Sequence, residues 1–166
     1  MTKIIYGSST GNTEEAAMLI RKHLDENIDV IDVTNASRED FEEADKLILG
    51  SSTWGEGDLQ DDWEGFLPTL EGLDMHGKTV ALFGLGDQEE YPENFVDAMG
   101  ILCEKMKEAG AQIVGFTETE GYDFDESRAV NEEGKFCGLA LDMDNQEDLT
   151  EERIAAWTAA IKDKIL

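Results

Sequence analysis

Residues 3–13, KIIYGSSTGNT, join a short apolar run to a helical pattern through a turn of glycine and hydroxyl residues. The apolar run suits a strand that is buried on both faces of a sheet. In the turn, hydroxyls, glycine amides and a helix N-terminus can all donate hydrogen bonds to an anion. The stretch therefore predicts a phosphate site. The alternative is an ordinary turn in which Asn12 caps the helix and Glu15 completes a capping box.

The same turn contains no lysine and lacks the Gly-x-x-x-x-Gly-Lys spacing. It is therefore neither a nucleotide triphosphatase loop nor a dinucleotide-binding fingerprint. A phosphate bound here would rely on neutral donors.

Apolar runs of strand length recur along the chain at residues 28–33, 47–50, 79–84 and 112–116. Helical patterns lie between and after them, at residues 13–24, 37–41 and 63–70, in the stripe Phe95, Met99, Leu102, Met106 and Ala109, and in the stripe Ile154, Trp157, Ile161 and Ile165 with Thr150 as N-cap. This alternation predicts one doubly wound α/β domain over residues 1–166, with a parallel sheet between helices. Asp29 and Asp32 mark the second run as an edge strand.

A polar stretch, residues 118–135, separates the apolar residues 113–116 from the apolar residues 136–141. A connection of this length without its own apolar pattern is uncommon inside a compact domain. We therefore interpret it as an insertion that splits the last strand.

The composition excludes several classes of protein. The formal charge is 13 − 39 = −26 over 166 residues, which makes nucleic acid and anionic membranes poor partners and basic proteins good ones. With 40% hydrophobic residues and two prolines, the chain is expected to fold. No uncharged apolar stretch approaches the roughly 18 residues of a membrane span, and residues 2–6 are too short for a signal-peptide core. We therefore expect a soluble protein that is not exported, and we expect it to be a monomer.

Two cysteines, Cys103 and Cys137, are too few for a disulfide framework in a chain of this size. This favours a reducing cytoplasm. We expect Cys103 beside the apolar stripe of its helix and Cys137 as a buried strand thiol. His23 and His76 are isolated in the sequence, so no metal site is expected.

Two further loops follow strands at the edge where ligands bind in open α/β sheets. In residues 51–58, Trp54 stands among small residues as a stacking platform or, alternatively, folds back over the core. In residues 84–95, Gly86 permits close backbone approach, Asp87 offers acceptors or forms a turn, and Tyr91 supplies a second ring. Together with the phosphate turn, these loops predict a flat phosphorylated ring system as ligand. We assign the other tryptophans, Trp63 and Trp157, to the core.

On these motifs the whole chain resembles the flavodoxin family, in its long-chain branch. The matching segments are residues 8–13, 53–55, 84–88, 121–125 and 138–142. The resemblance implies a five-stranded parallel sheet in the order 2-1-3-4-5 and a bound FMN. By position it implies that the cofactor contacts Ser8, Ser9, Thr10, Gly11, Asn12, Thr13, Thr53, Trp54, Gly55, Gly84, Leu85, Gly86, Asp87, Tyr91 and Asn94, with Asp144 near the ribityl chain.

The resemblance also implies one-electron transfer at low potential, between the flavin semiquinone and hydroquinone. A flip of the peptide after Gly55 could present a carbonyl to flavin N5, at low cost because glycine is flexible. Neither flavin loop contains lysine or arginine, while acidic residues surround both. The anion that a second reduction makes on the flavin is therefore disfavoured.

The implied partners are basic redox proteins such as a ferredoxin-NADP reductase, steered by the acidic surface. One alternative is an FMN-dependent NAD(P)H:quinone reductase of the same fold, which NADPH alone would reduce. Another is a receiver-type signalling module. That class requires acidic residues after the first and third strands, where this chain has Gly7-Ser8-Ser9 and Ser51-Ser52.

Overall fold

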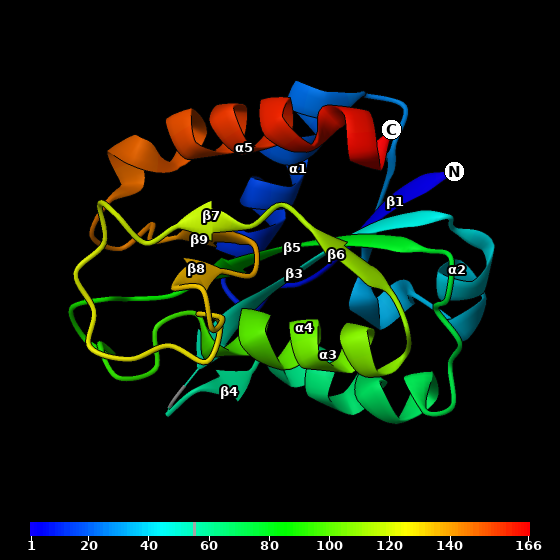
Figure 1. The fold of residues 1–166 in the computed structure, drawn as a ribbon, viewed down its shortest axis with the longest axis horizontal. Helices are drawn as coiled ribbons and strands as arrows, with labels where there is room; N and C mark the ends of the chain where they lie inside the picture. The colour runs from blue at the N-terminus through cyan, green and yellow to red at the C-terminus, as the bar shows by residue number, and fades with distance from the viewer. Residues whose placement is uncertain (55) are drawn as a thin grey trace.

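Each predicted apolar run forms a strand of one central sheet in the computed structural model, which describes residues 1–54 and 56–166 (Figure 1). The sheet contains β1 (Thr2–Gly7), β2 (Asp29–Asp32), β3 (Lys46–Trp54), β4 (Asp58–Leu59), β5 (Thr79–Leu85), β6 (Gln112–Val114) and β9 (Leu139–Leu141). Its main path runs β2-β1-β3-β5-β6, with all neighbours parallel. The predicted order is confirmed, and β2 is the expected edge strand.

Two features of the sheet differ from the sequence-based prediction. Strand β3 extends beyond residue 50 to Trp54, so the first part of the second loop is strand. The two-residue β4 then pairs antiparallel with the end of β3. A pairing this short has no apolar periodicity of its own, and only its position beside β3 makes it a strand.

Helices cover both faces of the sheet, as predicted (Figure 1). They are α1 (Asn12–Leu24), α2 (Arg38–Glu43), α3 (Asp61–Phe66), α4 (Asp97–Glu108) and α5 (Thr150–Ile165), with 3-10 turns η1 (Val33–Asn35), η2 (Leu67–Leu70) and η3 (Glu147–Leu149). Successive residues of β1 serve opposite faces, because side chains alternate along a strand. Ile4 joins the core under α1 and α5, whereas Ile5 joins the core under α2, α3 and α4.

The helix starts differ from two expectations. Helix α1 begins at Asn12 with Gly11 as its N-cap, so the capping box of Asn12 and Glu15 does not form. Helix α5 begins at Thr150 itself, after Leu149, so Thr150 is not the N-cap. The 3-10 turn η3 leads directly into α5, and the backbone N–H of Thr150 donates to the carbonyl of Glu147 in that turn. A side-chain cap is therefore not needed there.

The last sheet position is occupied by two short strands. Strand β6 pairs with residues 79–81 of β5, and β9 pairs with residues 83–85. Between them, β7 (Thr117–Glu118) and β8 (Lys135–Phe136) form a separate antiparallel ribbon. The segment between β6 and β9 therefore leaves the sheet and returns to it along the same neighbouring strand, β5.

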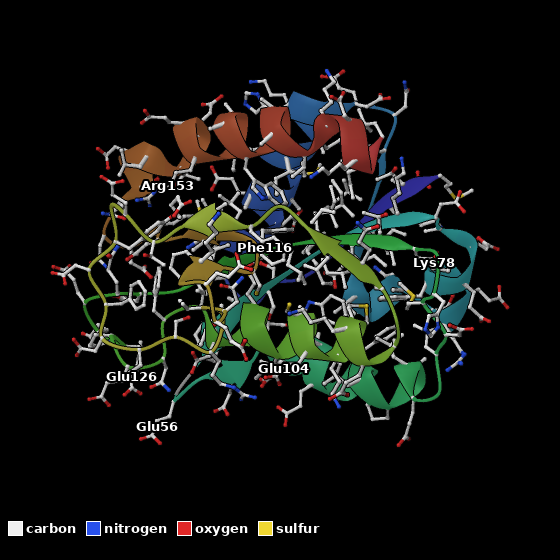
Figure 2. All side chains as sticks on the ribbon, viewed as in Figure 1. Glu56, Lys78, Glu104, Phe116, Glu126 and Arg153 are labelled. Carbon is white, nitrogen blue, oxygen red and sulfur yellow. The ribbon has the colours of Figure 1, made fainter. Side chains whose placement is uncertain are left out.

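Aromatic packing ties this segment to the domain. Tyr122 and Phe124 lie against Phe95 and Phe136, at ring-centroid distances from 5.1 to 5.7 Å. The Tyr122 hydroxyl donates to the carbonyl of Ala140, and burial raises the pKa of this phenol to about 12. Arg153 of α5, labelled in Figure 2, stacks 4.0 Å from the centre of the Tyr122 ring.

Both thiols are buried and free. Cys103 lies on α4 as expected, whereas Cys137 lies in the bend between β8 and β9 and not in a strand. The bend arises because the chain turns there from the ribbon into the sheet. Among residues 1–54 and 56–166, no helix is long and apolar enough to cross a membrane.

Candidate functional site

The strand register brings the ends of the parallel strands to one edge of the sheet. Gly7 of β1 pairs with Ser51 of β3, and Ser51 pairs with Gly84 of β5. Leu85 in turn pairs with Leu141 of β9. The segments after these strands therefore meet, and they enclose a cavity of about 280 Å³. Its lining residues are Thr10, Asn12, Ser52, Thr53, Trp54, Leu85, Gly86, Asp87, Tyr91, Met143 and Asp144.

The turn after β1 presents an uncapped helix N-terminus to this edge. Ser8 Oγ accepts from the amide of Gly11 at 3.0 Å, and Gly11 adopts the left-handed conformation with φ of 94°. No side chain of the described residues caps α1. The first N–H groups of this helix therefore remain free to bind an anion, and the helix dipole strengthens that binding.

Gln60, which the sequence analysis did not single out, supports this turn. Its side chain is buried, with 1% exposure. Its Nε2 donates to Ser9 Oγ at 3.1 Å, and its Oε1 accepts from the amides of Asp62 and Trp63. Gln60 is the N-cap of α3, so one amide group links the start of that helix to the turn. A polar residue before a helical pattern was the only signal for it in the sequence.

Gly7→Ala is expected to disrupt this support. A Cβ on Gly7 would lie 2.3 Å from Gln60 Oε1 and 2.6 Å from Trp63 Cδ1, so both buried side chains would have to move. We expect a loss of about 1–3 kcal/mol in the free energy of unfolding, measured by urea denaturation. Gly65→Ala on α3 is the matched control, because nothing lies within 4 Å of its added Cβ. Equal stability of the two variants would refute the argument.

Two aromatic rings are exposed beside the cavity. Trp54 at the end of β3 is 40% exposed and Tyr91 is 45% exposed, although both residues line the cavity. The Trp54 indole Nε1 donates to Ser52 Oγ at 2.8 Å, which orients the ring. The alternative in which Trp54 folds over the core is wrong. Trp63 and Trp157 are core residues as predicted, with 0% and 3% exposure.

Asp87 forms a turn and also lines the cavity. Its Oδ1 accepts from the amides of Glu89 and Glu90 and from Asn145 Nδ2, at 3.1, 2.9 and 2.7 Å. Burial alone would raise the pKa of Asp87, but these hydrogen bonds outweigh it and lower the pKa. The carboxylate is therefore charged at neutral pH and holds the loop that carries Tyr91, whose amide donates to the Asp87 carbonyl.

The buried carboxylate of Asp142 joins three segments. It is 1% exposed and accepts from the backbone and side-chain amides of Gln88 at 3.1 and 2.8 Å. It also accepts from the amides of Asp144 and Asn145 and from the side chain of Asn145. Gln88 Oε1 accepts from the amide of Asp123 in the inserted segment. Asp142 therefore connects the Tyr91 loop, the loop after β9 and the insertion.

Comparison with known proteins places this geometry in a family. The model of the Flavodoxin family matches residues 4–157 of this chain. The chain is 53% identical over 166 residues to a flavodoxin of Synechocystis sp., covering 98% of this chain and 97% of that protein. It is 46% identical over 166 residues to flavodoxin 1 of Escherichia coli, covering 99% and 94%.

The chain belongs to the flavodoxin family. A Fusobacterium nucleatum flavodoxin solved bound to flavin mononucleotide is similar to it throughout. That structure has a TM-score of 0.92 and 35% sequence identity, covering 99% of this chain and 98% of the other.

The structure places most of the residues predicted from the flavodoxin resemblance in or beside the cavity. Those lining the cavity are Thr10, Asn12, Thr53, Trp54, Leu85, Gly86, Asp87 and Tyr91, together with Asp144. Ser8, Ser9 and Gly11 form the turn beside it. Thr13 is 1% exposed within the first turn of α1. Gly55, with its expected peptide flip, lies outside the described residues.

Three of the predicted residues, Gly84, Gly86 and Asn94, have close neighbours outside the cavity. Gly84 packs against α4, because a Cβ there would lie 2.8 Å from Met99 Cβ. Gly86 lines the cavity, but its close backbone neighbour is Val96, whose N would lie 2.9 Å from a Cβ. The structure does not bring Asn94 to the cavity. Its Nδ2 donates to Asp97 at 3.1 Å, beside a separate hollow of about 710 Å³.

Proposed function

We propose that this member of the flavodoxin family carries single electrons on an FMN held without a covalent bond in the 280 Å³ cavity. Flavodoxins are electron carriers and not enzymes, and the bound flavin supplies two successive one-electron reductions. The observation that carries the proposal is the pair of exposed rings, Trp54 and Tyr91, beside an uncapped helix N-terminus. This arrangement fits a flat ring with a phosphate at the end of its side chain.

Different groups of the chain would bind the phosphate and the ring of FMN. The hydroxyls of Ser8, Ser9 and Thr10 and the first amides of α1 would donate to the phosphate. Trp54 and Tyr91 would cover the two faces of the flavin and exclude water from it. Thr53, which also lines the cavity, is fixed to the start of α4, because its Oγ1 accepts from the amide of Ala98 at 3.0 Å.

The charges around the cavity favour a low potential for the second electron. Asp87 and Asp144 line the cavity, and no lysine or arginine does among the residues that the structure describes. Burial raises the pKa of Asp144, and so do the neighbouring carboxylates of Asp87 and Asp142. The same negative field opposes an added negative charge on the flavin, which lowers the potential of the second reduction.

Visible spectra of the purified protein during stepwise reduction test this function directly. We expect flavin absorbance in the isolated protein, release of FMN on denaturation, and two resolved one-electron stages. NADPH alone should leave the spectrum oxidised, which separates a carrier from an FMN-dependent quinone reductase. A colourless protein that does not bind added FMN in equilibrium dialysis would disprove the proposal.

Asp144→Asn is expected to raise the potential of the second electron by about 40 mV, because it removes one charge beside the cavity. In the folded protein the pKa of Asp144 is raised, so its charged form costs stability above that pKa, and protonation relieves the cost as pH falls through it. Without cofactor, the variant should therefore be slightly more stable at pH 7 and lose this gain in acid. Redox titration and urea denaturation measure the two effects, with exposed Glu147→Gln as control. An unchanged potential would contradict the role of Asp144.

We further propose basic redox proteins as partners, with a ferredoxin-NADP reductase as one class. The support is the formal charge of −26, whose steering effect should weaken with added salt. The two free thiols suit a carrier that works as a monomer in the cytoplasm. The segment between β7 and β8 suits the long-chain branch of the family.

A further inference from the structure

Two thiols meet on the side of the molecule where α4 faces the inserted segment. Cys103 and Cys137 come from positions 34 residues apart and are each 3% exposed. Both residues line one cavity. The Cys137 thiol also lies 4.0 Å from the carbonyl of Met99, one helical turn before Cys103. Tertiary packing has therefore brought the Cys137 thiol beside the turn of α4 that carries Cys103.

A cavity of about 460 Å³ reaches both cysteines. Its walls include Lys107 and Glu104 from α4, Arg128 from the inserted segment, and Phe116. Glu104 and Phe116 are labelled in Figure 2, and Phe116 is 44% exposed. A small polar molecule can therefore approach the buried sulfur atoms from solvent.

We propose that Cys103 and Cys137 are an oxidation site, at which a hydroperoxide converts the two thiols into a reversible disulfide. This site is separate from the cavity that carries the proposed electron-transfer function. The competing interpretation is that both cysteines are small core residues that merely fill space. Two observations favour an oxidation site: the Cys137 thiol lies beside the turn of α4 that carries Cys103, and one cavity reaches both residues.

The two cysteines suit different steps of this reaction. Hydrogen bonding to Cys137 lowers the pKa of Cys103, and the nearby Lys107 adds to this effect. Hydrogen bonding to Cys103, together with burial, raises the pKa of Cys137. Cys103 is therefore the thiol that attacks first, and Cys137 is the one that resolves the product.

The atoms and electrons balance with hydrogen peroxide as the oxidant. The Cys103 thiolate attacks one peroxide oxygen, the O–O bond breaks, and the leaving hydroxide takes a proton to become water. Cys103 is then a sulfenic acid. The Cys137 sulfur attacks the Cys103 sulfur, the S–O bond breaks, and the oxygen leaves as a second water with the Cys137 proton. Two thiols are oxidised to one disulfide while the peroxide is reduced to two waters.

Peptide mapping of the intact chain tests this proposal. The flavin-loaded protein is treated with hydrogen peroxide and then denatured in the presence of N-ethylmaleimide, which labels the remaining free thiols. It is digested with trypsin without prior reduction. Residues 79–105 and 136–153 are the tryptic peptides that contain the two cysteines. We expect them to be joined by a disulfide within one chain, with near-complete loss of maleimide label at both sites. Dithiothreitol should restore both labels.

Met18, which is 43% exposed, reports in the same digest that peroxide has acted. The proposal is overturned if Met18 is oxidised while both cysteines still take the label. It is also overturned if Cys103 forms a sulfinic acid beside free Cys137, or if the disulfide joins two chains.

Single variants separate the roles of the two thiols. In Cys137→Ser, Cys103 should be trapped by dimedone as a sulfenic acid after peroxide treatment. In Cys103→Ser, Cys137 should remain a thiol that takes the label. Oxidation of Cys137 in that variant would contradict the order of attack. If a variant fails to fold, the wild-type map still decides whether the disulfide forms.

Discussion

Trp54→Ala and Tyr91→Ala are each expected to weaken FMN binding by about 30- to 150-fold, which corresponds to about 2–3 kcal/mol. Each change removes an aromatic face beside the cavity, at a residue that is already 40% or 45% exposed. Little folding stability should be lost, because neither ring belongs to a core cluster. The loss should therefore appear as a higher dissociation constant for FMN. That constant is measured by titrating FMN with cofactor-free protein and following the quenching of FMN fluorescence.

The same two variants should raise the potential of the second electron, since water could then solvate the added charge. Phe116→Ala is the matched control, because Phe116 is 44% exposed but lines a different cavity. Tyr91→Phe keeps the ring and should bind FMN nearly as well as the wild type. Wild-type affinity in both alanine variants would refute the placement of FMN between these rings.

Asp142→Ala is expected to lower the free energy of unfolding by about 2–4 kcal/mol. The carboxylate is 1% exposed, and its loss would leave donors of Gln88, Asp144 and Asn145 without their acceptor. Because these donors hold the loops on both sides of the cavity, we also expect weaker FMN binding. Urea denaturation and flavin titration measure the two losses.

Asp142→Asn should have an intermediate effect, because one oxygen remains as an acceptor while the new amide faces other donors. Asp163→Ala, on the exposed side of α5, is the control for removing one negative charge. If Asp142→Ala were as stable as this control, the connecting role of Asp142 would be wrong.

The main elements of the sheet could be predicted because their signals are local. Buried parallel strands have apolar runs, and the α4 and α5 stripes have helical spacing. Local signals did not predict the start of α5 at Thr150 or the short strand β4. Thr150 is a good cap by residue type, yet the preceding turn η3 makes it the first residue of α5. β4 exists only because it lies beside β3.

In the candidate site, too, the residue types could be predicted from the sequence, whereas their contacts could not. Trp54 and Tyr91 could be recognised as candidates, but the sequence left open whether Trp54 packed over the core and whether Tyr91 only rested on the surface. Asn94 has a suitable side chain, yet its hydrogen bond to Asp97 holds it beside a different hollow. Gln60 and Asp142 carried almost no signal, because their partners are distant in the chain or are backbone amides.

The sequence by itself determined the alternation of strands and helices, the glycine- and hydroxyl-rich turn at residues 8–13 and the acidity of the chain. These properties depend on residue type and short-range spacing. Only the tertiary structure decided which loops enclose the cavity, that Asp142 joins them, and that Cys137 lies beside the turn of α4 that carries Cys103. Those contacts depend on strand register and helix packing, which place residues far apart in the chain within hydrogen-bonding distance.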